Sequence, residues 1–219
     1  MTVEAVVFDM DGVLIETEEM WDEVREQLAQ ETGARYDAVA QRAMMGMSAP
    51  EWSAYMEQLG VPGPPAAIDA EVVRRLIARY RERLPLIPGA VDAVQRLAAA
   101  GFTLAVASSS NRVLIDLVLA ESGLAPLFTA TASSEEVARG KPSPDVYLEA
   151  CRRIGVDPAA AAAVEDSHSG IRSAKAAGLR VLAIPNASYP PGTEALALAD
   201  LVLPGLAALT PEAVRGSAR

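Results

Sequence analysis

The chain has 219 residues, of which 51% are hydrophobic and 22% charged, a composition typical of one large globular domain or of a domain that carries an insertion. Its 19 Lys and Arg against 29 Asp and Glu give a net charge of -10, which opposes binding to the phosphate backbone of nucleic acids. No apolar stretch approaches the roughly 20 residues of a membrane span, and the acid-rich first twenty residues hold no Lys or Arg, so we expect neither a membrane anchor nor a signal peptide.

Cysteine and histidine each occur once, as Cys151 and His168. An intramolecular disulfide is therefore excluded, which favours a reducing, cytoplasmic location. A zinc site built from several such ligands is excluded as well. We expect Cys151 to be buried in a helix rather than to act as a nucleophile, and His168 to bond locally in the first turn of its helix.

The first predicted strand, residues 5–8, runs directly into Asp9-Met10-Asp11-Gly12. Side chains of a strand alternate between its two faces, so Asp9 and Asp11 converge only if the strand ends between them and Gly12 lets the backbone turn. Two converging carboxylates repel each other unless a cation lies between them. The stretch predicts half of a Mg²⁺ site, although an ordinary Asp-Gly turn would show the same sequence.

Helical patterns follow for about seventy residues. The first helix carries Trp21, Val24 and Leu28 on one face and is expected to end at Gly33, and further helices are predicted over residues 36–45, 50–59 and 67–84. Ser48 is expected to cap the third of these helices. We therefore predict a helical cap domain over residues 16–85, inserted into a core formed by residues 1–15 and 86–219.

From Gly89 onward helices and strands alternate, which predicts a doubly wound parallel sheet and an α/β fold of Rossmann-like type. Strands are expected over residues 103–107, 128–132, 161–164, 181–184 and 201–203. Polar clusters lie near the ends of these strands: residues 108–111, the loop with Lys141, and Glu165-Asp166. Because ligands of an open parallel sheet bind beyond the carboxyl ends of its strands, these clusters and Asp9 predict one common site.

Four motifs in this order resemble those of the haloacid dehalogenase-like superfamily, in the subgroup of β-phosphoglucomutase and the small sugar-phosphate phosphatases. They are D-x-D-G-V/L at residues 9–14, a serine at the end of a strand at Ser108, K-P-x-P-D at residues 141–145 and an acidic pair at Glu165-Asp166. The resemblance covers nearly the whole chain. It places the predicted helical insertion where that subgroup has its helical cap.

The resemblance implies that Asp9 is a nucleophile that forms an aspartyl-phosphate, and that Asp11 acts as general acid and base. It implies a Mg²⁺ ion held by the Asp9 carboxylate, the backbone carbonyl of Asp11 and Asp166, with Glu165 nearby directly or through water. The residues expected to bind the phosphoryl oxygens are Lys141, Ser108, Ser109 and Asn111. Ser108, Glu165 and Asp166 could also be simple caps of the helices that follow them.

Two cap positions bear on the reaction. Phosphomutases of this subgroup carry a histidine four residues after the threonine that corresponds to Thr17, and an arginine after the G-x-S of the cap. This chain has Trp21 and Ala49 at those positions. We therefore predict a monomeric, Mg²⁺-dependent phosphatase of a small sugar or sugar-alcohol phosphate. The alternatives are a phosphomutase and a non-catalytic ligand-binding protein.

Substrate specificity is expected to lie in the cap, with Thr17, Trp21 and Ser48 as candidates. Trp21, Met44, Met45, Met47 and Trp52 are expected to form cap core, and an aromatic ring among them could stack on a sugar. Arg75, Arg79 and Arg83 share one helix face. Glu71, four residues before Arg75, favours an ion-paired, solvated face over a surface that attracts anionic substrates.

Overall fold

The computed structural model describes residues 2–44, 47–186 and 189–216. A six-stranded sheet in the order β3-β2-β1-β4-β5-β6 forms its centre, and every pair of neighbouring strands is parallel. The strands are β1 (Ala5–Phe8), β2 (Thr103–Ser108), β3 (Ala130–Ser133), β4 (Ala161–Glu165), β5 (Arg180–Ala183) and β6 (Leu201–Val202). The predicted parallel α/β fold is confirmed.

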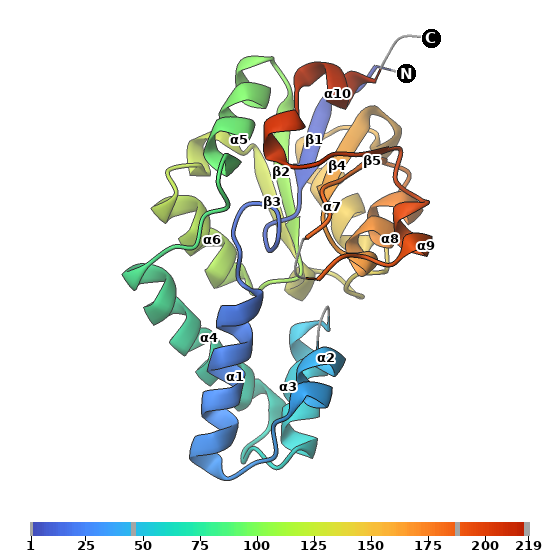
Figure 1. Ribbon diagram of the computed structural model, residues 1–219. Coiled ribbons are helices and arrows are strands. Elements are labelled where there is room, and N and C mark those ends of the chain that lie inside the picture. The colour runs from blue at the N-terminus through green and yellow to red at the C-terminus, as the bar shows by residue number, and fades with distance from the viewer. Residues whose placement is uncertain (1, 45–46, 187–188, 217–219) are drawn as a thin grey trace.

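Helices cover both faces of this sheet (Figure 1). One face packs against α5 (Ala90–Ala99) and α6 (Arg112–Glu121), and the other packs against α7 (Asp145–Ile154) and α8 (His168–Ala176). The 3-10 turns are residues 125–127, 134–136, 158–160 and 206–208. The sequence pattern predicted neither α9 (Thr193–Leu196) nor α10 (Pro211–Arg215), because four or five residues are too few to show helical periodicity.

Strand β1 is buried on both faces, as its unbroken apolar sequence requires. Val6 and Phe8 belong to the core beneath α5 and α6, whereas Ala5 and Val7 belong to the core beneath α7 and α8. The second core is built largely of alanines from the strands, whose small side chains leave room for the fully buried Tyr147 of α7. Cys151, on the same helix, is also buried, as predicted.

Four helices between β1 and α5 gather beyond the carboxyl ends of the strands (Figure 1). They are α1 (Glu18–Thr32), α2 (Ala38–Met44), α3 (Ala49–Gln58) and α4 (Pro65–Glu82), and we call them the cap. The predicted positions agree to within about two residues. Met45 and Gly46, predicted at the end of the second cap helix, lie outside the described residues.

The two segments that join the cap to the sheet run side by side. The backbone N-H of Glu16 donates to the carbonyl of Pro85 at 2.8 Å, and that of Ile87 donates to the carbonyl of Leu14 at 3.0 Å. The predicted domain boundaries at residues 15/16 and 85/86 fall in this paired region. The cap is therefore attached through a two-stranded connection rather than through one loose linker.

Two of the three arginines predicted to share a helix face are ion-paired, as Glu71 predicted, whereas Arg83 follows the last residue of α4. Arg75 contacts Glu31 at 2.6 Å and Glu71 at 2.8 Å, and Arg79 lies 3.6 Å from Glu23.

Within the described part of the chain, no helix has both the length and the apolar character needed to cross a bilayer.

Two leucines on the helices that cover the sheet differ in burial, so we expect their replacement by alanine to destabilise the protein to different extents. Leu97 of α5 is fully buried, whereas Leu148 of α7 is 41% exposed. We expect Leu97→Ala to lower the free energy of unfolding by about 2 to 5 kcal/mol, because it leaves a cavity. Leu148→Ala should lower it by less than about 1 kcal/mol. Urea unfolding of both variants checks this, and equal losses would contradict the assignment of the core.

Candidate active site

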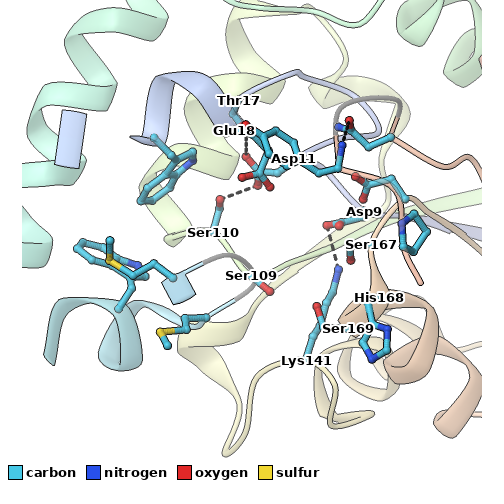
Figure 2. A pocket seen from close by; sticks show the side chains of 18 of the residues that line it. Asp9, Asp11, Thr17, Glu18, Ser109, Ser110, Lys141, Ser167, His168 and Ser169 are labelled. Atoms are coloured by element: carbon cyan, nitrogen blue, oxygen red, sulfur yellow. Dashed lines mark hydrogen bonds and ion pairs between the residues drawn. The ribbon is translucent and has the colours of Figure 1, made fainter. Parts of the chain in front are cut away.

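Asp9 and Asp11 lie where β1 gives way to the segment that enters the cap (Figure 2). Gly12 makes this turn with φ at +80°, a conformation that side chains with a Cβ rarely adopt. A Cβ at this position would also lie 2.0 Å from Oδ2 of Asp166. Glycine is therefore required twice over, for the turn and for the close approach of Asp166.

Lys141 joins Asp9 to Glu165. Its Nζ lies 3.0 Å from Oδ1 of Asp9 and 2.7 Å from Oε1 of Glu165, and the side chain points at Asp9 in Figure 2. Tyr147 also donates to Oε1 of Glu165, and the backbone N-H of Asp166 donates to Oε2. Glu165 is thus a fully buried carboxylate with both oxygens engaged, and it fixes the position of the ammonium beside Asp9.

Asp9, Glu165 and Asp166 form a buried acidic cluster, each with an oxygen within 4.8 Å of the others. Three carboxylates against the single ammonium of Lys141 leave two uncompensated negative charges when all are ionised. Burial and the charge of Glu165 accordingly raise the pKa of Asp9 to about 8, and burial raises the pKa of Asp166 well above its ordinary value. Such a cluster could hold a divalent cation.

Two further observations support a cation at this place. Oδ1 of Asp166 is buried and has no hydrogen-bond partner among the described residues, so one strong acceptor is left to a ligand. Burial alone would lower the pKa of Lys141, but Asp9 and Glu165 outweigh it and raise that pKa. The lysine is therefore charged at neutral pH and already engaged by two carboxylates.

Asp11 has different surroundings. Its Oδ1 accepts a hydrogen bond from Thr17 at 2.6 Å, and its Oδ2 accepts one from Ser110 at 2.7 Å. Thr17, a candidate for cap specificity, thus lies against Asp11. The hydroxyl of Ser108 also donates to Oδ2 of Asp11, at 3.4 Å. Ser110 was not among the predicted site residues, because a run of three serines after a strand does not reveal which hydroxyl approaches Asp11 most closely.

The predicted phosphate-binding residues Ser108, Ser109 and Asn111 differ in where their side chains lie and in what they contact. Ser109 lines the cavity described below. Ser108 is fully buried and its hydroxyl accepts from the N-H of Ser110. The Nδ2 of Asn111 donates to Asp69 of α4 and to Glu135, so this amide links the cap to the core.

A cavity of about 480 Å³ lies between the strand ends and the cap. The core lines it with Asp9, Asp11, Lys141 and Asp166, and the cap lines it with Thr17, Glu18, Trp21, Arg25, Met44, Met47, Glu51 and Trp52. Trp21 therefore reaches the site, as the hypothesis about specificity required. None of Arg75, Arg79 and Arg83 occurs among the described lining residues.

Ser48 lies apart from this cavity, whereas His168 borders it. Ser48 precedes α3 and bonds through its hydroxyl and its N-H to Glu51. It lines a second cavity, of about 610 Å³, on the other side of α3. His168 lines the first cavity at the start of α8 with an exposed side chain.

Arg25 was not among the predicted site residues, yet its guanidinium lies 4.7 Å from the ring centroids of both Trp21 and Trp52. The spacing of four residues between Trp21 and Arg25 places both on one face of α1 and was the available signal. The contact with Trp52 depends on how α1 packs against α3, which no local pattern encodes.

Comparison with known proteins gives consistent results. A family model described as haloacid dehalogenase-like hydrolase matches residues 3–178. Protein CbbY of Rhodobacter capsulatus is 35% identical, with 98% of each chain covered, and hexitol phosphatase B of Escherichia coli K12 is 32% identical, covering 97% of this chain and 96% of the relative. The crystal structure of a CbbY mutant from Rhodobacter sphaeroides with xylulose-(1,5)bisphosphate superposes with a TM-score of 0.84 at 31% identity, covering 94% and 95% of the two chains.

The acidic cluster predicts a stability that depends on pH and on divalent cations. Because the pKa of Asp9 is raised from 3.8 to about 8, the folded state binds a proton that the unfolded chain releases. The stability contributed by this group in the metal-free protein therefore falls as pH rises from about 4 to about 8. At pH 8, saturating MgCl₂ should raise Tm by roughly 5 to 10 °C, and by much less at pH 5, where protons compete for the carboxylates.

Thermal melting with EDTA and with MgCl₂ at both pH values checks this expectation. Asp166→Asn removes one charge of the cluster and should lose most of the shift. An equal shift in this variant, or no shift in the native protein, would contradict a cation at this cluster.

Proposed function

Because the chain belongs to the haloacid dehalogenase-like hydrolases, we propose that it is a Mg²⁺-dependent phosphatase that acts on a small phosphorylated sugar or sugar alcohol through an aspartyl-phosphate. The observation that carries the proposal is the buried cluster of Asp9, Lys141, Glu165 and Asp166 at the floor of a cavity. A carboxylate attacks a negatively charged phosphoryl group only when cations offset the repulsion.

The residues present suit Mg²⁺. The ion prefers oxygen ligands, and the cluster offers carboxylates, including the unpartnered Oδ1 of Asp166. We assign the ion to the carboxylates of Asp9 and Asp166 and the backbone carbonyl of Asp11, with Glu165 adding its charge. When bound, Mg²⁺ would supply the positive charge that the cluster lacks and would offset the negative charge of the phosphoryl oxygens.

Asp9 acts as the nucleophile. One of its carboxylate oxygens forms a bond to phosphorus while the bond from phosphorus to the ester oxygen breaks, and the leaving oxygen takes a proton from Asp11. Asp11 then takes a proton from water as the water oxygen bonds to phosphorus. The bond between phosphorus and Asp9 breaks, which releases phosphate and regenerates Asp9.

Lys141 and the neighbours of Asp11 support these steps. The ammonium of Lys141 lies 3.0 Å from Asp9 and offsets negative charge as phosphate approaches. Thr17 and Ser110 each hold one oxygen of Asp11, which keeps its carboxyl group oriented toward the cavity. Thr17 belongs to the entry of the cap, so this support depends on the cap being in place.

The substrate class follows from the relatives and from the cavity. The relatives include a protein named for hexitol phosphates and one crystallised with xylulose-(1,5)bisphosphate. In this chain two tryptophan rings line the cavity and can stack on a sugar chain. Trp21 and Ala49 stand where phosphomutases have their histidine and arginine, which favours release of phosphate over its return to the sugar.

Cytoplasmic location and a monomeric state stay predictions.

Asp9→Asn should lower kcat for phosphate release by at least about 1,000-fold, because the amide cannot form the phosphoryl ester. The matched control is Asp116→Asn on the surface of α6, which should retain the native rate. Phosphate release from a panel of sugar and polyol phosphates with MgCl₂, and with excess EDTA, measures both. Turnover of Asp9→Asn within tenfold of native, activity that survives EDTA, or isomerised sugar phosphate without free phosphate would contradict the proposal.

A further inference from the structure

Arg25 is a cation at the cap side of the cavity. Its guanidinium contacts the rings of Trp21 and Trp52, the two tryptophans of the chain, at 4.7 Å from each centroid. The two rings meet edge to face with their centroids 5.9 Å apart. These contacts hold the guanidinium in one place through cation-π attraction, so its donors are already oriented before a ligand arrives.

The acids around Arg25 do not pair with it. Both oxygens of Asp22 are engaged, one by Tyr36 at 2.6 Å and the other by Gln41 at 2.8 Å. Glu18 also lines the cavity. Glu18 and Asp22 are near enough for their charges to act on Arg25 and oppose the fall of its pKa, but within the described part of the chain neither forms an ion pair with it. The Nε of Arg25 is buried and has no hydrogen-bond partner among the described residues.

This leaves Arg25 with a role that packing alone does not explain. The cationic residues in the described lining of the cavity are Arg25 and Lys141, and Lys141 is already held by Asp9 and Glu165. Burial lowers the pKa of Arg25 to about 10, so the group is partly desolvated yet charged at neutral pH. A partly desolvated guanidinium that faces a cavity without a paired carboxylate is suited to bind an anion from outside, in the forked geometry that arginine favours.

We propose that Arg25 binds a second anionic group of the substrate, at the end remote from the phosphate that Asp9 attacks. The preferred substrates are then phosphate monoesters with a distal carboxylate or a second phosphate, rather than neutral sugar or polyol monophosphates. The inference rests on the proposed phosphatase function and adds the charge of the substrate's far end. The two tryptophan rings beside Arg25 contact the carbon chain between the two anions.

A matched pair of substrates tests this. Sorbitol 6-phosphate and 6-phosphogluconate share one six-carbon chain and differ at its far end, which is a neutral hydroxymethyl group in the first and a carboxylate in the second. We expect the native protein to hydrolyse 6-phosphogluconate with a kcat/KM at least about tenfold higher. Glucose 6-phosphate against glucose 1,6-bisphosphate forms a second arm, and it tells whether the distal anion is a carboxylate or a phosphate.

Variants separate recognition from packing. Arg25→Gln should raise KM for the substrate with the distal anion by about 10- to 100-fold, with less than about a threefold change for its neutral counterpart. Arg25→Lys, which keeps the charge, should restore part of the loss. Arg79→Gln, an ion-paired arginine of the cap outside the described cavity lining, is the matched control and should behave as native.

The outcomes are distinct. Equal kcat/KM for both members of each pair, or an equal loss on both in Arg25→Gln, would overturn the inference and leave Arg25 a packing residue. Hydrolysis of p-nitrophenyl phosphate, which has no distal anion, reports separately on the proposed phosphatase function. If no ester is hydrolysed, that function fails, and calorimetric binding of 6-phosphogluconate to native and Arg25→Gln protein still decides the inference: equal affinities would overturn it, and affinity lost only in Arg25→Gln would support it.

Discussion

The structure depends on the burial of three carboxylates beside one ammonium at the carboxyl ends of β1 and β4. The parallel register of these strands, with Phe8 opposite Val164, places Asp9 next to Glu165. Burying like charges costs free energy unless opposite charge offsets it. Lys141 offsets part of it, held by Glu165 and Asp9, and a divalent cation offsets the rest in our account. The same deficit of positive charge weakens the metal-free fold and, in our proposal, makes attack by Asp9 on an anionic phosphoryl group depend on the added cation.

The cap is inserted directly after Asp9 and Asp11, and we propose that it determines which substrate reaches the cluster. Asp11 follows the strand by three residues and is held by Thr17, the residue before the first cap helix. The cap then closes the cavity with Trp21, Arg25 and Trp52. In our proposal, the core residues at the floor of the cavity carry out phosphoryl transfer, and the cap residues at its roof contact the rest of the substrate.

Much of the fold could be predicted from the sequence because its signals are local. The run of residues 5–8 before Asp9 marked a buried strand, and polar clusters at strand ends marked the edge where Asp9, Lys141, Glu165 and Asp166 meet. Packing between distant segments could not be predicted. Ser110 approaches Asp11 more closely than Ser108 does, and the amide of Asn111 turns toward Asp69, because of how the chain leaves β2 beneath the cap. Arg25 shows the same limit, because its site exists only once α1 and α3 have packed together.

The central claim is that Asp9 takes the phosphoryl group before water does. The stereochemical course at phosphorus tests it most directly, with a phosphorothioate substrate that carries sulfur and two different oxygen isotopes on phosphorus. Hydrolysis in water of the third oxygen isotope then releases a thiophosphate that is chiral at phosphorus. Each in-line displacement inverts phosphorus. Two displacements, first by Asp9 and then by water, give net retention, which is the result we predict. Net inversion would mean that water attacks the substrate directly, and it would contradict the account.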